Sequence, residues 1–256
     1  MVENPMEPDE VRDEVQQQLC QTPFECSSLS RLSGGTANFI YRGTTLSGSP
    51  TSIIIKHTKN YLSSNASFKL DAERCVSVCQ CSEKNTVLTL TQHFEGAILR
   101  VLDGFKSNEV SDKITVRTPR LFHFDRETNT QVLEDLPDST DLKHFLISDL
   151  PRDMSQASAR ALGHSLGSWL RDFHAWASKP GQALIRETLS KNQGLKDLKF
   201  YINYTWLLDT IGNFPEILNS SRDVFEKVRD RAAEELKRTK YDDDYNVIHG
   251  DFWTGK

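Results

Sequence analysis

The end of the sequence carries residues that could act in acid–base chemistry. Residues 245–248 are a brief apolar stretch that leads directly to His249 and Asp251. An aspartate on a loop after a strand can orient and deprotonate a hydroxyl nucleophile, and a neighbouring histidine can hold that loop in place. A polar tail without function is the alternative. Phe252 and Trp253 argue against it, because disordered segments are poor in large apolar residues.

A pair of glycines near the other end of the chain is suited to bind an anion. Ser33, Gly34, Gly35 and Thr36 lie between two short extended stretches. Glycines let backbone N–H groups approach a phosphate with no side chain in the way. A plain hairpin turn is the alternative, because glycine pairs are common in such turns.

A lysine and a glutamate could complete a phosphate site. Residues 51–57 are β-branched and apolar up to Lys56, as in a buried strand, so this lysine would place its charge at the edge of a sheet. Glu73 lies on the next expected helix, at residues 66–81, and could hold Lys56 in place through an ion pair. A lysine that reaches solvent and a solvated helical glutamate are the alternatives.

The elements that must position these residues change in type along the chain. A short helix is expected at residues 9–20, and residues 83–117 show no pattern that assigns them. Short β-rich stretches between turn residues predict an antiparallel meander followed by a hairpin. The expected strands are residues 26–32, 38–44, 51–57, 120–124 and 130–134, with a brief strand at 245–248 near the end.

Helices dominate the second half of the chain. The expected helices are residues 140–146, 156–177, 197–211 and 221–239. The second has the clearest pattern, because Leu162, Leu166, Trp169, Phe173 and Trp176 recur every three or four residues. We expect part of this broad apolar face to stay exposed and to cause self-association. Strands first and helices second predict an α+β fold with two lobes.

Composition limits the class of protein. The chain has 256 residues, 37% of them hydrophobic and 26% charged, as in soluble globular proteins. Its net charge of −5 argues against a nucleic-acid partner. No apolar run approaches the ~20 residues that cross a bilayer, and the acidic N-terminus lacks the pattern of a secretory signal. We therefore expect no membrane partner and a cytoplasmic location.

Five motifs together resemble the aminoglycoside phosphotransferase and choline-kinase-like superfamily, over residues 28–255. The order along the chain is LSGGTANFIYR, IIIKH, a helical glutamate, VLEDLP and VIHGDFWTG. The resemblance implies a protein-kinase-like bilobal fold and an ATP-dependent phosphotransferase that acts on a small-molecule hydroxyl. It also implies an N-terminal extension at 1–25, an ATP-binding N-lobe at 26–136 with one helix packed on an antiparallel sheet, and a helical, incomplete C-lobe at 137–256.

The resemblance also implies a role for each candidate residue. The loop of Ser33, Gly34, Gly35 and Thr36 would cover the phosphates of ATP. Lys56 would contact these phosphates, and Glu73 would orient Lys56. Glu134 and Leu136 look like the hinge that offers backbone groups to adenine. Asp251 would position and deprotonate the acceptor hydroxyl, and His249 would brace the catalytic loop.

The sequence departs from the family pattern at the metal ligands. The family carries an asparagine five residues beyond the catalytic aspartate and a second metal-binding aspartate further on. Lys256 stands at the first position, and a lysine repels Mg²⁺. We therefore expect a C-terminally truncated chain, inactive as given, with Mg²⁺ used by the full-length family member and no metal site here. The alternative is a nucleotide-binding pseudokinase or interaction module without catalysis.

Overall fold

The structure is a computed structural model of the chain. It describes residues 8–32, 38–59, 61–63, 65–69, 87–103, 105, 114–149, 154–218, 221–237 and 246–248. These residues divide into two compact units, the first ending at Trp176 and the second beginning at Ala177. The α+β class expected from the sequence is confirmed, because the first unit holds an antiparallel sheet and the second is helical.

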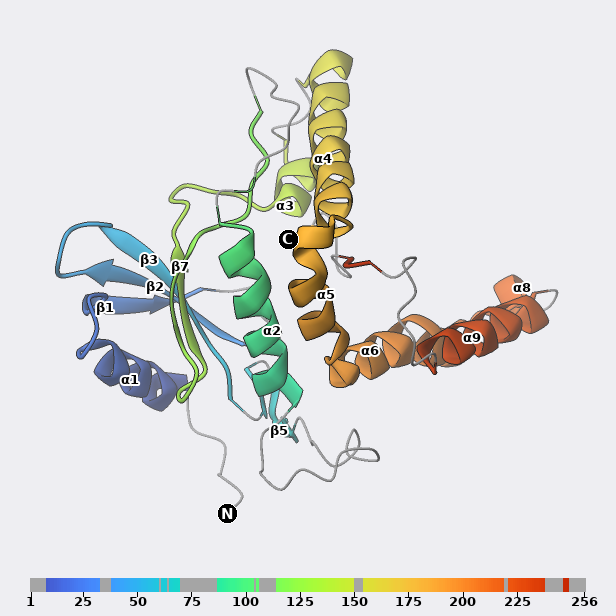
Figure 1. Ribbon diagram of the computed structural model, residues 1–256, viewed down its shortest axis with the longest axis horizontal. Helices are drawn as coiled ribbons and strands as arrows, with labels where there is room; N and C mark the ends of the chain where they lie inside the picture. Colours follow the sequence, from blue (N-terminus) through green and yellow to red (C-terminus); the bar gives the residue numbers. More distant parts are fainter. Residues whose placement is uncertain are drawn as a thin grey trace. The chain divides into compact units, whose positions relative to one another are not determined.

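A five-stranded antiparallel sheet organises the described part of the first unit (Figure 1). Its strand order is β1-β2-β3-β7-β6. The strands are β1 (Cys26–Arg31), β2 (Phe39–Thr45), β3 (Ser52–His57), β7 (Thr130–Glu134) and β6 (Leu121–Asp125). The expected meander and hairpin are both confirmed. The hairpin joins the meander through β7, which pairs with β3 across a long connection.

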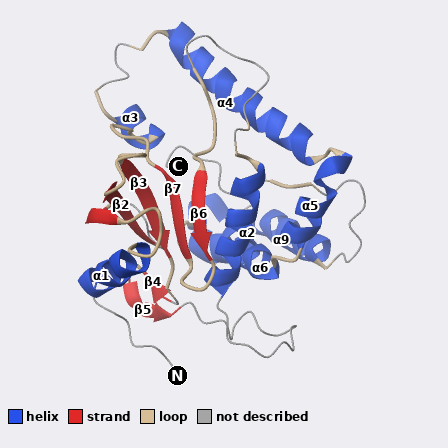
Figure 2. Ribbon diagram, turned by 60° about the vertical axis from the view of Figure 1, so that its left-hand side comes forward, coloured by secondary structure: helices blue, strands red, loops and turns tan. Residues whose placement is uncertain are grey.

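Strand β3 lies in the centre of the sheet and sends alternate side chains to its two faces. Ile53, Ile55 and His57 are buried on one face, whereas Ile54 and Lys56 are half-buried on the other. Both faces are covered by a helix (Figures 1 and 2). The alternation therefore separates a structural face from the face that carries the candidate lysine.

Helix α1 (Pro8–Leu19) covers the first face. Val11, Val15 and Leu19 recur every four residues and form one stripe of the helix, and each is at most 2% exposed. They pack in one core with residues of the strands, among them Tyr41 and Ile55. The N-terminal helix thus belongs to the core of the sheet. The expected domain boundaries after residues 25 and 136 stay predictions.

Polar contacts fix α1 at the edge of this core. The Thr130 hydroxyl donates to Gln18 Oε1 at 3.0 Å and lies 2.8 Å from Nδ1 of the buried His57. Because that hydroxyl has one hydrogen, it accepts from His57, whose neutral ring then carries its proton on Nδ1. Lys59 Nζ donates to Glu14 Oε2 at 2.6 Å on the same side of the sheet.

Helix α2 (Val87–Val101) contacts β6 on the second face. It lies in the stretch that the sequence left unassigned. The helix expected at residues 66–81 is wrong over residues 66–69, which belong to β5 (Asn65–Lys69), a strand paired with β4 (Tyr61–Leu62). Hairpin pairing with the neighbouring strand outweighs the helical spacing of apolar residues there. The rest of that expected helix lies outside the described residues.

Two helices follow the sheet within the first unit, α3 (Leu142–Ile147) and α4 (Gln156–Ala177). The bounds expected for α4 are confirmed, and its apolar stripe is buried only in part. Trp169 and Phe173 are 4% and 3% exposed. The ring of Phe105 lies 5.9 Å from Trp169 and 5.8 Å from Trp176, so an aromatic cluster covers this part of the stripe, while the rest of it is half-buried.

Helical segments make up most of the described part of the second unit. They are η3 (Pro180–Gln182), α5 (Ala183–Ser190), α6 (Gln193–Phe200), the π-helix η4 (Tyr201–Trp206), α7 (Leu207–Ile211), α8 (Pro215–Leu218) and α9 (Arg222–Leu236). The helix expected at 197–211 is divided by the π-helix, and α5 was not expected. Residues 246–248 belong to no strand, which corrects the expectation for that segment.

Exposed apolar side chains gather on the helices of this second unit. Tyr201, Trp206, Phe214, Val224 and Val228 are each about half exposed or more. They form a second exposed apolar surface, and the self-association expected from the apolar face of α4 stays a prediction. Within the described residues, no helix is both long and apolar enough to cross a membrane.

Candidate nucleotide-binding site

An ion pair between Lys56 and Glu95 lies on the second face of the sheet. Lys56 Nζ donates to both carboxylate oxygens of Glu95, at 2.7 Å for Oε1 and 2.6 Å for Oε2. The lysine side chain is 18% exposed, and the glutamate side chain is 35% exposed. The pair is therefore partly shielded from water, and the lysine points along the face instead of into bulk solvent.

A glycine lets α2 approach the sheet closely enough to form this pair. Gly96 follows Glu95 on α2, and a Cβ atom at Gly96 would come 2.8 Å from the ring of Phe124 on β6. That distance is shorter than two carbon atoms tolerate without displacement. The missing side chain thus sets the depth of α2 on the sheet and, with it, the position of the Glu95 carboxylate.

An apolar floor extends from Lys56 along the same face. The strand register places Ile40 beside Lys56, and it places Ile54 beside Leu133. All three apolar side chains are half-buried. Ser52 marks the far end of the floor, four residues before Lys56, which corresponds to about 13 Å along a strand. An apolar strip can stack against a base, and a cation at its end can contact the phosphates attached to that base.

Glu134 ends β7 at the far end of the floor, and its side chain is held by arginine. Arg117 Nη2 donates to Glu134 Oε1 at 2.8 Å, and the backbone N–H of Arg120 donates to Oε2 at 3.2 Å. The bonds from Arg117 are the main reason that the pKa of Glu134 lies below its ordinary value. Leu136 is 45% exposed and follows directly. Its carbonyl accepts from the backbone N–H of Ser139 at 3.3 Å.

Asp135 lies between these two residues, and its side chain is buried. It is 2% exposed. Arg42 Nη2 donates to Asp135 Oδ1 at 3.1 Å, and Arg42 Nε lies 2.9 Å from Oδ2. The Ser52 hydroxyl donates to the same Oδ2 at 2.8 Å. This cluster of Arg42, Ser52 and Asp135 was not expected from the sequence, although the two adjacent acidic residues after an apolar strand could have drawn attention to it.

Several expected site residues lie outside the described residues: Ser33, Gly34, Gly35, Thr36, Glu73, His249 and Asp251. Their roles stay predictions. Lys56 lies on the second face of the sheet, while Glu134 and Leu136 follow at the end of β7. The carboxylate in contact with Lys56 is Glu95, which sequence reasoning missed because its helix was unassigned.

Metal ligands do not gather in the described part of the chain. Among those residues, no group of three or more His, Cys, Asp or Glu side chains is placed to hold a metal ion. Lys256 and the residues around Asp251 lie outside this part. The absence of a metal site thus stays a prediction.

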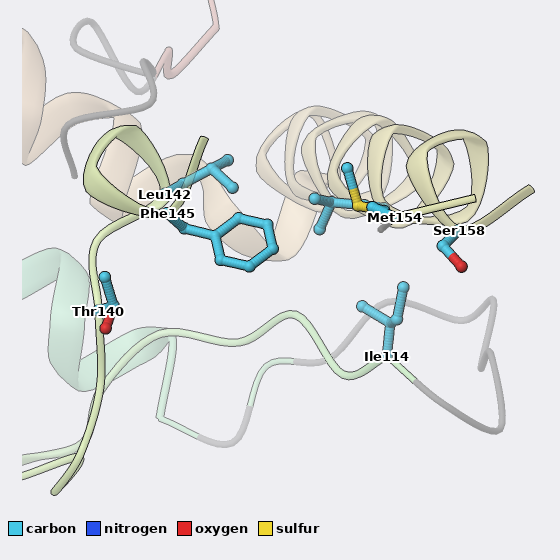
Figure 3. Close-up of a pocket in the computed structure, with 7 residues that line it drawn as sticks. Ile114, Thr140, Leu142, Phe145, Met154 and Ser158 are labelled. Carbon is cyan, nitrogen blue, oxygen red and sulfur yellow. The ribbon is translucent and has the colours of Figure 1, made fainter. Parts of the chain in front are cut away.

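A separate pocket lies between α3 and the start of α4, with a volume of about 350 Å³. Figure 3 shows Phe145 of α3 directed into it, with Ile114 and Met154 across the space. The lining residues are Ile114, Thr140, Leu142, Phe145, Met154, Ser158 and Leu162. They include no ionisable side chain, so the pocket suits an uncharged apolar group and not a phosphate.

The sheet, its two covering helices and the lysine–carboxylate pair are consistent with the N-terminal half of a kinase-like fold. Comparison with known proteins relates the chain to the same class. Over 256 residues, the chain is 33% identical to phosphotransferase FrzJ of Cladobotryum sp. The match covers 98% of this chain and 63% of FrzJ. Over 151 residues, it is 26% identical to 4-hydroxytryptamine kinase of Psilocybe cyanescens. That match covers 58% of this chain and 36% of the kinase.

Both relatives are named for phosphoryl transfer, so the chain is similar to kinase-like phosphotransferases. The chain spans less than two thirds of the length of FrzJ and about a third of the 4-hydroxytryptamine kinase. No protein-family model matches the chain.

Proposed function

We propose that this chain carries the ATP-binding part of a phosphotransferase of the aminoglycoside-phosphotransferase type, which moves the γ-phosphoryl group of ATP to a hydroxyl of a small molecule. The observation that carries the proposal is the pair of Lys56 and Glu95 on an apolar sheet face. A lysine on a central strand, held by a carboxylate of the covering helix, is the arrangement by which kinases grip the phosphates of ATP.

Each described residue has a defined task in this proposal. Lys56 contacts phosphate oxygens of ATP and neutralises part of their charge. Glu95 holds the ammonium group toward the phosphates, so little side-chain freedom is lost when ATP binds. The base lies on the floor of Ile54 and Leu133, and the backbone at Glu134 and Leu136 offers hydrogen bonds to its edge.

The acceptor side of the reaction rests on the expected roles of His249 and Asp251. Asp251 accepts the proton of the acceptor hydroxyl while that oxygen attacks the γ-phosphorus, and ADP leaves. His249 braces the loop that carries Asp251. A magnesium ion would help to neutralise the phosphates in the full-length family member, but Lys256 stands here where the resemblance places one of its ligands. The tasks of Lys56 and Glu95 do not depend on it.

Phosphoryl transfer from labelled ATP tests the proposal directly. The acceptor panel combines 4-hydroxytryptamine, choline and an aminoglycoside, because the relatives and the resemblance point to small hydroxyl compounds. The chain as given is expected to be inactive, so labelled product that is lost in an Asp251→Asn variant would support the phosphotransferase and overturn that expectation. The expectation that Lys256 impairs metal binding predicts a higher rate in a Lys256→Asn variant.

The same assay distinguishes the second candidate, a nucleotide-binding module without catalysis, which the cation at Lys256 favours. ATP binding that does not depend on Mg²⁺, without transfer in the wild type or in Lys256→Asn, would support that module. The absence of ATP binding in the wild type would overturn both candidates.

A further inference from the structure

We propose that Asp135 is a positioning residue that fixes the backbone of Glu134–Leu136 for recognition of the base. The inference rests on the proposed ATP-binding function and extends it to a residue whose own side chain does not touch the nucleotide. It assigns the cluster of Arg42, Ser52 and the buried Asp135 side chain a role in base affinity.

The two acidic side chains anchor this segment on opposite sides. Successive residues of an extended chain point to opposite faces. Glu134 is bound by Arg117 on one side, and Asp135 is bound by Arg42 and Ser52 on the other. The backbone between them is therefore held from both directions. Leu136 follows directly and is 45% exposed, so a ligand can reach the backbone at this position.

The cluster ties together three strands at one end of the nucleotide face. Arg42 belongs to β2, Ser52 begins β3, and Asp135 directly follows β7. The register of β3 and β7 pairs Ile53 with Glu134, so Ser52 and Asp135 are neighbours just beyond that pair. Any shift of the segment after β7 would separate the carboxylate from both partners at once.

Burial makes the position of Asp135 sensitive to these partners. A carboxylate that is 2% exposed has lost almost all its water and must obtain its hydrogen bonds from the protein. The Arg42 guanidinium and the Ser52 hydroxyl supply one hydrogen bond each, and the contact of Arg42 Nε adds charge attraction. The segment is thereby restricted to one conformation before a ligand arrives, and this lowers the entropy cost of binding.

Two ligands that each represent one part of ATP allow the base end and the phosphate end of the site to be tested separately. Adenosine probes the base end, whereas magnesium tripolyphosphate probes the phosphate end at Lys56. The dissociation constants of both are measured by calorimetry for the wild type, Asp135→Asn and Ser52→Ala, together with thermal unfolding of each protein. Ser52→Ala removes one hydrogen bond and leaves the ion pair, so it serves if Asp135→Asn does not fold. Glu14→Gln is the matched control, because it removes a half-buried ion pair on the opposite face.

We expect adenosine affinity to fall about tenfold in Asp135→Asn, corresponding to ~1.4 kcal/mol, and less in Ser52→Ala. Tripolyphosphate affinity should stay unchanged in both, and the Glu14→Gln control should keep both affinities. Unchanged adenosine affinity, or an equal loss for both ligands, would overturn the positioning role while leaving the proposed function intact. Failure of the wild type to bind ATP would overturn the proposed function and this inference together.

Discussion

Lys56 and Glu95 are 39 positions apart in sequence, yet the lysine nitrogen lies within 2.7 Å of both oxygens of the glutamate. The pair joins the central strand of the sheet to the helix that covers its second face. A lysine that merely reached solvent would need no such partner. The pair places a directed positive charge at one end of an apolar floor, and it is the basis of the proposed nucleotide site.

Two equivalent substitutions test whether Glu95 or Glu73 is the carboxylate that holds Lys56. Glu95→Gln should weaken ATP binding about tenfold, because the ammonium group loses a charged hydrogen-bond partner and is no longer held toward the phosphates. Glu73→Gln should leave the affinity unchanged. Calorimetric titration of both variants with ATP measures the difference. A loss of ATP affinity in Glu73→Gln, with the affinity of Glu95→Gln unchanged, would identify Glu73 as the partner of Lys56, as expected from the sequence.

Because α2 packs closely on β6 at Gly96, adding a single methyl group there should affect both stability and ATP binding. Gly96→Ala should lower the free energy of unfolding by about 1–3 kcal/mol, because its Cβ meets the ring of Phe124. It should also weaken ATP binding, since Glu95 moves with the helix. Urea unfolding and ATP titration measure the two effects. Adding Phe124→Leu should recover part of each, and a Gly96→Ala protein with wild-type stability and affinity would show that α2 does not lie at this depth.

His57 predicts a pH-dependent stability. Burial, with a smaller effect of Lys59, lowers its pKa from 6.5 to about 4, against an opposing effect of Glu14. Between these values the unfolded chain binds a proton that the folded chain does not. The free energy of unfolding should therefore fall as the pH is lowered from about 6.5 to 4, by about 3 kcal/mol from this group.

A His57→Gln variant isolates that effect, because the amide can still donate to Thr130 but does not titrate. Urea unfolding at pH 7 and pH 4.5 should show a smaller loss of stability in the variant than in the wild type. Equal losses in the two proteins would mean that His57 is protonated in the folded state.

Helix α1 should be required for the stability of the sheet. Leu19 is 2% exposed in the core beneath β1 and β2, so Leu19→Ala should lower the free energy of unfolding by about 2–5 kcal/mol. Gln17→Ala, at an exposed position of the same helix, is the control and should change it little. Similar stabilities of the two variants in urea would indicate that α1 does not pack on this face.

The strands and the long helix α4 could be predicted because their patterns are local. The β-branched run before Lys56 and the three- and four-residue spacing from Leu162 to Trp176 each specify one element. Glu95 could not be identified in this way. Its helix has no clear boundary signal, and its contact with Lys56 depends on tertiary packing at Gly96.

Asp135 illustrates the same limit. Its burial depends on a guanidinium from another strand, 93 positions away, and a sequence does not reveal such a partner without the sheet register. The burial of Trp169 on α4 has a related cause. Phe105, which packs on Trp169, comes from a stretch with no assigned structure. Pairwise contacts between distant segments, rather than local periodicity, decided these outcomes.

Calorimetric titration of ATP into the wild type, Lys56→Met and Lys59→Met tests the central claim most directly. Both lysines form an ion pair of 2.6 Å with a glutamate, but Lys56 pairs with α2 and Lys59 pairs with α1 on the opposite face. We predict that Lys56→Met weakens ATP binding at least about tenfold, because a charged contact to phosphate is lost, while Lys59→Met binds as the wild type does. Equal affinities of Lys56→Met and the wild type would contradict a nucleotide site at Lys56.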